Sequence, residues 1–328
     1  MKYRTLGKTG FKVSEVSLGT WQLGGKWGDK FDERSAEETL RSAVETGVNF
    51  FDTADGYVDG LSEKAIGKFI KTISERIYVA TKCGRKLNPH NADGYNRKNI
   101  RGFVHDSLKN MGLEVLDLIQ LHCPPTEVYS KQEVYDTLDE LKKEGKILNY
   151  GVSVEKVQEA LIAMEHEGVA SIQLIFNMFR QKPIEELFEV AKKKNVGIIA
   201  RVPLASGLLS GKMSKNSTFG KTDHRLFNRN GEFFDKGETF SGVNFEVGLQ
   251  AAEELKQIFG EDKSLAQYAL RWILMFDSVS CVIPGASNQQ QAEANALASE
   301  LPPFTNEQME QVKEVYNKYI KKDVHHLW

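Results

Sequence analysis

The sequence predicts an α/β protein built as a (β/α)8 TIM barrel, with an N-terminal β-hairpin and a long loop after the seventh barrel strand. Strand-like and helix-like segments alternate about eight times along the 328 residues, which favours parallel strands joined by right-handed crossovers. No Gly-x-Gly-x-x-Gly motif follows an early strand, as the dinucleotide site of an open, doubly wound sheet would require. The closed barrel is therefore the leading prediction, and the open sheet is the alternative.

The predicted elements follow one another closely. Residues 3–15 are typical of a hairpin, because the turn Gly7-Lys8-Thr9-Gly10 separates two short strand-like runs. Eight apolar, β-branched runs come next, at 16–20, 48–53, 77–82, 116–122, 147–153, 171–177, 196–203 and 279–285. Residues 302–328 predict a C-terminal helix and a frayed tail, whose His325-His326 pair matches no metal pattern.

Helical patterns separate the strands. Apolar residues from Ile100 to Met111 recur on one helical face. Two capping boxes, Ser35 with Glu38 and Ser130 with Glu133, predict helix starts, because such side chains satisfy the first free N–H groups of a helix.

No low-complexity linker or composition break divides the chain, so we expect residues 1–328 to form a single domain. The exception to the short connections is 204–244, which is long and rich in Gly, Ser, Lys and Phe. Loops of this length are usually functional or mobile.

Composition argues against several classes of function. A net charge of −2 gives no electrostatic reason to expect a nucleic acid or membrane partner. No apolar run approaches the roughly 20 residues that span a bilayer, and the first residues lack a signal-peptide pattern. The odd, widely spaced cysteines Cys83, Cys123 and Cys281 favour reduced thiols and a cytoplasmic location.

Ionisable residues stand at three successive predicted strand ends. In a (β/α)8 barrel, the residue that ends each strand faces the active-site mouth. Asp52, Lys82 and His122 hold such positions, and Tyr57 follows Asp52 on a loop. A metal-dependent hydrolase could use Asp52 and His122 as ligands, but no second histidine ends a strand, so no metal is predicted. Strand alternation predicts that Cys83 and Cys123, the next residues after Lys82 and His122, pack on the outer side.

These residues lie in an ordered set of motifs that resembles the aldo-keto reductase family. The motifs are Phe51-Asp52-Thr53-Ala54-Asp55-Gly56-Tyr57, Ala80-Thr81-Lys82, Leu121-His122, Gly151-Val152-Ser153, residues 203–212 and Ile283-Pro284-Gly285. The resemblance runs from Tyr3 to about Leu301. It implies a barrel that binds a nicotinamide cofactor in extended form and reduces aldehydes or ketones, which are small-molecule carbonyl substrates.

The resemblance also implies a catalytic set of Asp52, Tyr57, Lys82 and His122. Hydride transfer to a carbonyl builds negative charge on oxygen, which a positioned proton donor must neutralise. Tyr57 is the expected donor, and we expect Lys82 to lower its pKa from about 10. Asp52 would hold Lys82 charged and oriented, and His122 would orient the carbonyl oxygen or assist proton transfer.

A second group of residues is implied to bind the cofactor. Its members are Gly19, Thr20, Trp21, Ser153, Gln173, Asn177, Arg201, Pro203, Leu204, Ser206, Gly207, Leu208, Ser210, Lys212, Gly285, Ser287, Gln291 and Asn295. Arg201 departs from the family, because many members place an aromatic ring there that stacks on the nicotinamide. A guanidinium can also stack through its plane.

The cofactor is expected to be NADP(H), with NAD(H) more usable than is normal in the family. No positive charge occurs from Gly285 to Leu301, where relatives that prefer NADP often carry basic residues. A 2′-phosphate is normally met by Arg or Lys. The alternative function is that of a cofactor-binding regulatory or redox-sensing subunit with little turnover, like the channel-associated relatives of this family.

Overall fold

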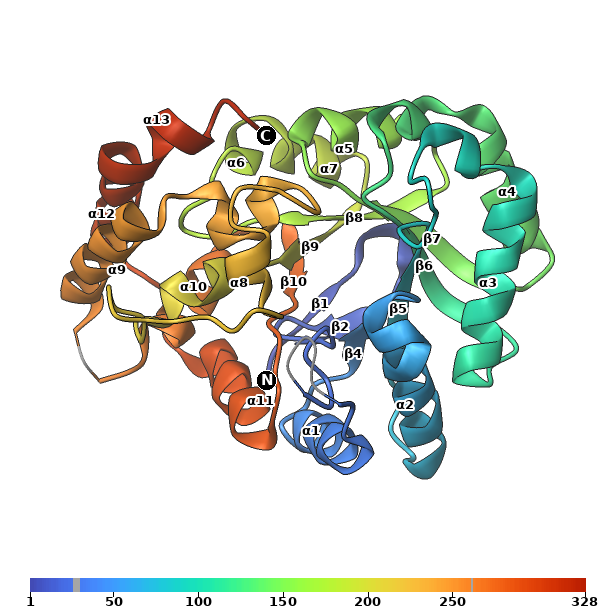
Figure 1. The fold of residues 1–328 in the computed structure, drawn as a ribbon, viewed down its shortest axis with the longest axis horizontal. Coiled ribbons are helices and arrows are strands. Elements are labelled where there is room, and N and C mark those ends of the chain that lie inside the picture. Colours follow the sequence, from blue (N-terminus) through green and yellow to red (C-terminus); the bar gives the residue numbers. More distant parts are fainter. Residues whose placement is uncertain (26–29, 261) are drawn as a thin grey trace.

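A computed structural model describes residues 1–25, 30–260 and 262–328. Eight parallel strands form one sheet in the order β3 to β10, and the helices surround it (Figure 1). The sheet closes where Val16 bridges Val282 and Gly19 bridges Gly285. A Cβ atom on Gly19 would lie 2.7 Å from the carbonyl oxygen of Ile283, so the closure depends on glycine at this position. The predicted (β/α)8 barrel is confirmed.

The barrel strands are β3 Leu18–Gly19, β4 Phe50–Asp52, β5 Tyr78–Cys83, β6 Leu116–His122, β7 Ile147–Ser153, β8 Val169–Ile175, β9 Gly197–Arg201 and β10 Val279–Val282. All eight predicted runs contain a strand, and the bounds of β6 and β7 agree with the prediction. Strand β8 ends two residues earlier than predicted, so Asn177 lies beyond the strand rather than at its end.

The helices are α1 Glu33–Glu45, α2 Leu61–Phe69, α3 Arg97–Met111, α4 Gln132–Lys143, α5 Val157–Ala163, α6 Pro183–Glu186, α7 Phe188–Lys193, α8 His224–Phe227, α9 Phe245–Phe259, α10 Leu265–Ile273, α11 Gln289–Ala296, α12 Asn306–Val315 and α13 Lys321–Val324. The predicted apolar face of α3 is buried, including Ile100, Val104, Leu108 and Met111. In the described part of the chain, no helix combines the length and the apolarity needed to cross a bilayer.

Both predicted capping boxes are wrong. Helix α1 begins two residues before Ser35, because the Asp32 side chain accepts a hydrogen bond from the Ser35 N–H at 3.0 Å. Helix α4 begins after Lys131, whose side chain makes no capping bond, so Ser130 lies outside the helix. Aspartate is as good an N-cap residue as serine, so the sequence pattern alone did not decide between Asp32 and Ser35 as the cap of α1.

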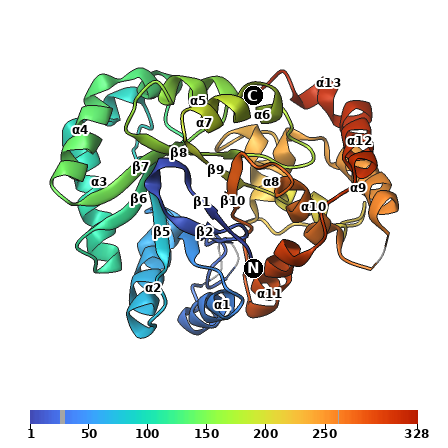
Figure 2. The ribbon, with the colours of Figure 1, turned by 180° about the vertical axis from the view of Figure 1, so that it is seen from behind.

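The hairpin of β1 Tyr3–Thr5 and β2 Lys12–Ser14 lies across one end of the barrel (Figure 2). Leu6 and Val13 pack against apolar side chains inside the barrel, among them Phe50, Leu118 and Ile199. All five side chains are fully buried. This end of the barrel is therefore filled by the hairpin, which leaves the opposite end for the polar residues.

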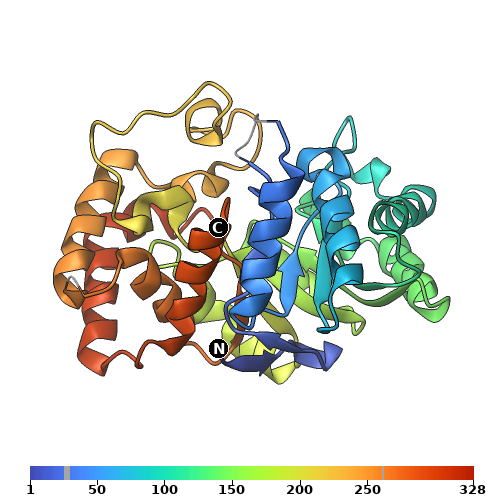
Figure 3. The same ribbon diagram turned by 90° about the horizontal axis from the view of Figure 1, so that it is seen from below.

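The segment 204–244 after the seventh barrel strand is a long connection, as predicted. It contains α8 and several short 3-10 turns, and it arches over the end of the barrel opposite the hairpin (Figure 3). The predicted frayed tail is wrong, because the Trp328 side chain is only 8% exposed and its indole donates to Asp235 Oδ1 at 2.9 Å. The tail therefore packs against the long segment.

Candidate active site

Asp52, Lys82 and Tyr57 form one hydrogen-bonded group at the barrel mouth. Strands β4 and β5 are paired, which brings Asp52 and Lys82 side by side at their carboxyl ends. Lys82 Nζ donates to Asp52 Oδ1 at 2.5 Å, to the Thr53 carbonyl at 2.8 Å and to the Tyr57 hydroxyl at 3.3 Å. All three ammonium protons thus have partners, and one of them points at the phenol.

The remaining oxygen of Asp52 is held by two amides. Gln173 Nε2 donates to Asp52 Oδ2 at 2.7 Å, and Gln120 Nε2 does so at 3.4 Å. The Asp52 carboxylate is buried, so these bonds and the Lys82 ammonium replace its water shell. The Gln173 amide, predicted to contact the cofactor, is engaged in orienting Asp52.

Burial and charge act against each other on the pKa of Tyr57. Burial and the Asp52 carboxylate raise the pKa of Tyr57. Together they outweigh the Lys82 ammonium, which lowers this pKa. The expected net lowering is therefore wrong, although Lys82 acts in the expected direction. Burial opposes the charge of Lys82, but Asp52 and Tyr57 outweigh it and raise the pKa of Lys82. At neutral pH, Lys82 is charged and Tyr57 carries its proton.

His122 lies beside Tyr57 as a neutral imidazole. The two ring centroids are 6.1 Å apart in an edge-on arrangement. Burial, reinforced by the nearby charges of Arg85 and Lys82, lowers the pKa of His122 well below its usual range. Its buried Nδ1 has no hydrogen-bond partner among the described residues. A neutral ring is suited to hydrogen bonding with a carbonyl oxygen.

Aromatic side chains form one wall of the mouth. The ring centroids of Trp21 and Tyr57 lie 6.3 Å apart with nearly parallel planes. His224 and Phe234, both from the long segment, contact Trp21 at centroid distances of 5.0 and 6.5 Å. The long segment therefore completes an apolar surface beside the phenol.

A network of buried ion pairs, which the sequence did not predict, borders this wall. Arg85 Nη1 donates to Glu238 Oε1 at 2.7 Å. Arg201 Nη2 donates to Glu155 Oε2 at 2.9 Å and to the Val154 carbonyl at 3.1 Å. The Arg201 side chain is thus fixed by protein groups at its edge.

Cys123 belongs to this network, so its predicted position outside the barrel is wrong. Its Sγ lies 3.5 Å from Arg201 Nη2 and 3.4 Å from Ser153 Oγ. Its φ of 46° ends the extended backbone of β6 and turns the side chain inward. Cys83 packs in the apolar core on the outer side, as predicted. Cys123, Glu155 and Glu238 lie close enough to hold a metal ion, but Arg85 and Arg201 already neutralise this group.

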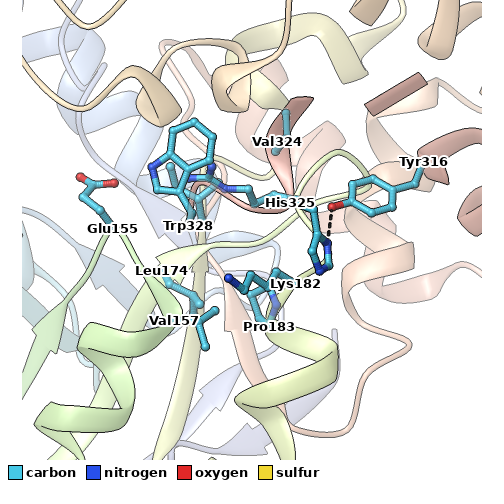
Figure 4. A pocket seen from close by; sticks show the side chains of 11 residues that line it. Glu155, Val157, Leu174, Lys182, Pro183, Tyr316, Val324, His325 and Trp328 are labelled. Atoms are coloured by element: carbon cyan, nitrogen blue, oxygen red, sulfur yellow. Dashed lines mark hydrogen bonds between the residues drawn. The ribbon is translucent and has the colours of Figure 1, made fainter. Parts of the chain in front are cut away.

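The packed tail closes a small hollow beside the network (Figure 4). Arg180 is only 3% exposed and its guanidinium carbon lies 3.6 Å from the Trp328 ring centroid. Neither Nη atom of Arg180 has a hydrogen-bond partner among the described residues. Glu155 and His325 also line the hollow. Burial of this kind lowers the pKa of Arg180 to about 9.

The other predicted cofactor residues lie around the same mouth with different surroundings. Asn177 Nδ2 donates to the Val202 carbonyl at 2.9 Å and to Ser241 Oγ at 2.8 Å, so its amide braces the long segment. Thr20 Oγ1 donates to the Asp52 carbonyl at 2.9 Å. Pro203, Leu204, Leu208, Ser210 and Lys212 follow β9, and only Lys212 among them is exposed.

Ser206 and Gly207 form a tight turn after β9. Their φ values are 54° and 102°, and Ser206 Oγ accepts from the Phe240 N–H at 3.0 Å. A serine in the left-handed region followed by glycine makes a sharp turn of the backbone at this place.

The residues predicted to contact the adenosine end of the cofactor lie just before and within α11. Ser287 N–H and Gln291 Oε1 are 2.9 Å apart, and Asn295 Nδ2 donates to the Gly285 carbonyl at 3.2 Å. These neutral side chains are half-buried or exposed.

Two of the missed residues had a signal in the sequence. Arg85 stands three positions after Lys82, and Glu155 stands two positions after Ser153, so both follow predicted strand ends. Glu238, Asp235 and Trp328 had none, because their positions depend on how a long connection and a tail pack onto the barrel.

Comparisons with known proteins identify the family of this chain. The aldo/keto reductase family model matches residues 15–317. An aldo-keto reductase from Bacillus subtilis is 30% identical over 301 residues, which is 90% of this chain and 87% of the relative. A probable voltage-gated potassium channel subunit beta from Arabidopsis thaliana is 29% identical, over 95% of this chain and 96% of the relative.

Solved structures are similar as well. A glycerol dehydrogenase from Gluconobacter oxydans gives a TM-score of 0.80 at 27% identity, with 97% of this chain and 96% of that one covered. The holo form of an aldo-keto reductase from Bacillus halodurans gives 0.77 at 27% identity, with 96% of each chain covered. With a barrel of this topology and a family model that spans nearly all of it, the chain belongs to the aldo/keto reductase family and is an NAD(P)H-dependent reductase.

Proposed function

We propose that Tyr57 is the general acid in the reduction of an aldehyde or ketone by this enzyme, with Lys82, Asp52 and His122 as its supporting residues. The observation that carries the proposal is the 3.3 Å hydrogen bond from Lys82 Nζ to the Tyr57 hydroxyl, within an ammonium–carboxylate pair. The bound nicotinamide cofactor would supply the hydride.

Each side chain has a distinct task. Tyr57 holds its proton at neutral pH, because burial raises its pKa, and it releases that proton to the oxygen that gains negative charge. Lys82 then stabilises the phenolate through the bond it already makes. Asp52 keeps Lys82 charged, and neutral His122 donates a hydrogen bond from its ring N–H to the same oxygen.

The residues fit a nicotinamide cofactor without a Rossmann site. The phenol and imidazole lie at the barrel mouth beside Trp21, and the Ser206–Gly207 turn offers backbone to a phosphate. We assign the nicotinamide end to Trp21, Ser153 and the plane of Arg201, and the adenosine end to Ser287, Gln291 and Asn295.

We further propose that NADPH is preferred only weakly over NADH. The support is the neutral stretch from Gly285 to Leu301, which offers hydrogen bonds but no charge to a 2′-phosphate.

The experiment is an assay of a simple aromatic aldehyde with both cofactors, together with the dissociation constants of NADPH and NADH. Turnover supports the catalytic assignment and separates it from a regulatory subunit, which would bind the cofactor with little turnover. A preference for NADPH beyond about a hundredfold, some 2.7 kcal/mol, would contradict weak selectivity.

A further inference from the structure

Two guanidinium groups flank one buried carboxylate at the barrel mouth. Glu238 Oε1 lies 2.7 Å from Arg85 Nη1 and 3.9 Å from Arg201 Nη1. The two arginines follow or end barrel strands β5 and β9, whereas Glu238 comes from the long segment 204–244. A loop thus delivers a negative charge to cations that the barrel positions.

This carboxylate lies beside the reacting groups. Cys123, the neighbour of His122 in sequence, is 3.5 Å from Arg201 Nη2. The Arg85 guanidinium carbon lies 5.4 Å from the ring centroid of Phe234, which packs edge-on against Trp21. The charge of Glu238 influences the pKa of both His122 and Tyr57. An anion at this place is therefore adjacent to a row of aromatic side chains, Phe234, Trp21 and Tyr57.

The place is built to hold negative charge. Burial disfavours an ionised carboxylate, yet Arg85 and Arg201 hold the pKa of Glu238 well below its usual range. The second acid, Glu155, is different, because burial raises its pKa to about 8 even with Arg201 beside it. Glu238 is therefore the carboxylate whose ionised form the two guanidiniums stabilise.

Guanidinium groups bind carboxylate and phosphate oxygens through parallel N–H donors. Arg85 uses Nη1 for Glu238, and part of its side chain remains open to solvent at the mouth. The geometry thus places an anion position beside an aromatic wall that includes the ring of Tyr57.

We propose that the enzyme selects aldehydes or ketones that carry a carboxylate or phosphate group, which Arg85 and Arg201 bind at the position now held by the Glu238 carboxylate. The proposal rests on the proposed function, because it concerns the substrate of the same site. The Glu238 carboxylate, which belongs to the long segment, then competes with the anionic group of the substrate for the two arginines. The apolar body of the substrate lies against Trp21 and Phe234.

The test compares 4-formylbenzoate with 4-formylbenzamide, which have the same shape and differ in charge. We expect kcat/KM in the wild type to favour the carboxylate at least tenfold. Arg85→Met should reduce this ratio at least tenfold, and Glu238→Gln should raise it about threefold or more, because a competing charge is removed. The aldehyde 4-formylphenyl phosphate should depend on Arg85 in the same way.

Single substitutions in a buried ion pair can prevent folding, so a charge-balanced variant is included. Arg85→Met combined with Glu238→Gln removes the pair without leaving a buried carboxylate unmatched. Its preference for the carboxylate should be at least tenfold below that of Glu238→Gln alone. Arg34→Met on α1 is the matched control, because its side chain is 88% exposed and the preference should not change.

Equal kcat/KM values for the two aldehydes in the wild type, or a preference that survives Arg85→Met, would overturn the proposal. If Arg85→Met weakens NADPH binding tenfold without changing the ratio, Arg85 serves the cofactor and the proposal is also overturned.

If neither aldehyde is reduced, the proposed function fails, and calorimetry on the NADPH-loaded protein then decides the present proposal. Tighter binding of 4-(hydroxymethyl)benzoate than of 4-(hydroxymethyl)benzamide, lost in Arg85→Met, would support it, and equal binding would overturn it.

Discussion

Lys82 and Asp52 form a 2.5 Å ion pair whose side chains are only 1% and 3% exposed. Each member of the pair also has two neutral partners. Asp52 accepts from the Gln173 amide at 2.7 Å and the Gln120 amide at 3.4 Å. Lys82 donates to the Thr53 carbonyl at 2.8 Å and the Tyr57 hydroxyl at 3.3 Å. This balance leads to the first prediction.

Asp52→Asn and Lys82→Met should each destabilise the protein. Removing one partner of a buried ion pair typically costs about 3–5 kcal/mol, because the other charge is left unmatched. We expect both variants to fall in this range, since each remaining charge keeps two neutral partners. Urea denaturation measures the free energy of unfolding of both variants, and a loss below about 1 kcal/mol in either one would contradict the prediction.

Tyr57→Phe should retain cofactor affinity and lower turnover by about 100-fold to 10,000-fold, which is the usual contribution of a positioned general acid. The phenyl ring keeps the packing on Trp21 and loses the proton. Stopped-flow kinetics and cofactor titration provide the two measurements. Tyr3→Phe, at a half-exposed tyrosine of the hairpin, is the control. Reduction by Tyr57→Phe at close to the wild-type rate would exclude the assigned role.

The pH profile of kcat/KM should show no ionisation of His122 between pH 6 and 9. Burial and the nearby cations hold the pKa of His122 below this range, and burial holds that of Tyr57 above its usual value of about 10. Activity should therefore fall only as the phenol loses its proton at high pH. An acid limb near pH 6.5 that vanishes in His122→Asn would contradict the prediction. A limb near pH 8 that vanishes in Glu155→Gln belongs to Glu155 instead.

Asp55→Asn should make the protein less sensitive to rising pH. Burial, with Glu63 nearby, raises the pKa of Asp55 to about 7, above its usual value of about 4. Between these values the folded state binds a proton that the unfolded state lacks, so stability of the wild type falls as pH rises. The free energy of unfolding of the variant should gain about 1.4 kcal/mol per pH unit relative to the wild type between pH 4 and 7, and no more above pH 7. Urea denaturation at pH 5, 6, 7 and 8 tests this, and a constant difference would contradict it.

The proximity of Asp52, Lys82 and His122 at the barrel mouth could be predicted, because strand ends can be recognised in a sequence. Asp52, Lys82 and His122 end runs of apolar residues, and a parallel barrel brings such ends together. The same logic failed at Cys123, where one residue with positive φ breaks the alternation of inner and outer side chains. It also failed at Ser35, because Asp32 takes the cap position.

Sequence patterns could not predict which residues from distant parts of the chain surround this group. Glu238 reaches Arg85 across 153 positions of sequence, and Trp328 reaches Asp235 across 93. These contacts depend on the path of an irregular segment, which has no hydrophobic period to reveal its orientation. Burial likewise reversed the expected shift in the pKa of Tyr57. How deeply a side chain is buried cannot be inferred from its neighbours along the chain.

Leu6 and Val13 fill the far end of the barrel, so ligands can reach the site only from the opposite end. The ligand that binds deepest must therefore bind first and be released last. Ligands are then expected to bind and leave in a fixed order. Product inhibition patterns would reveal that order.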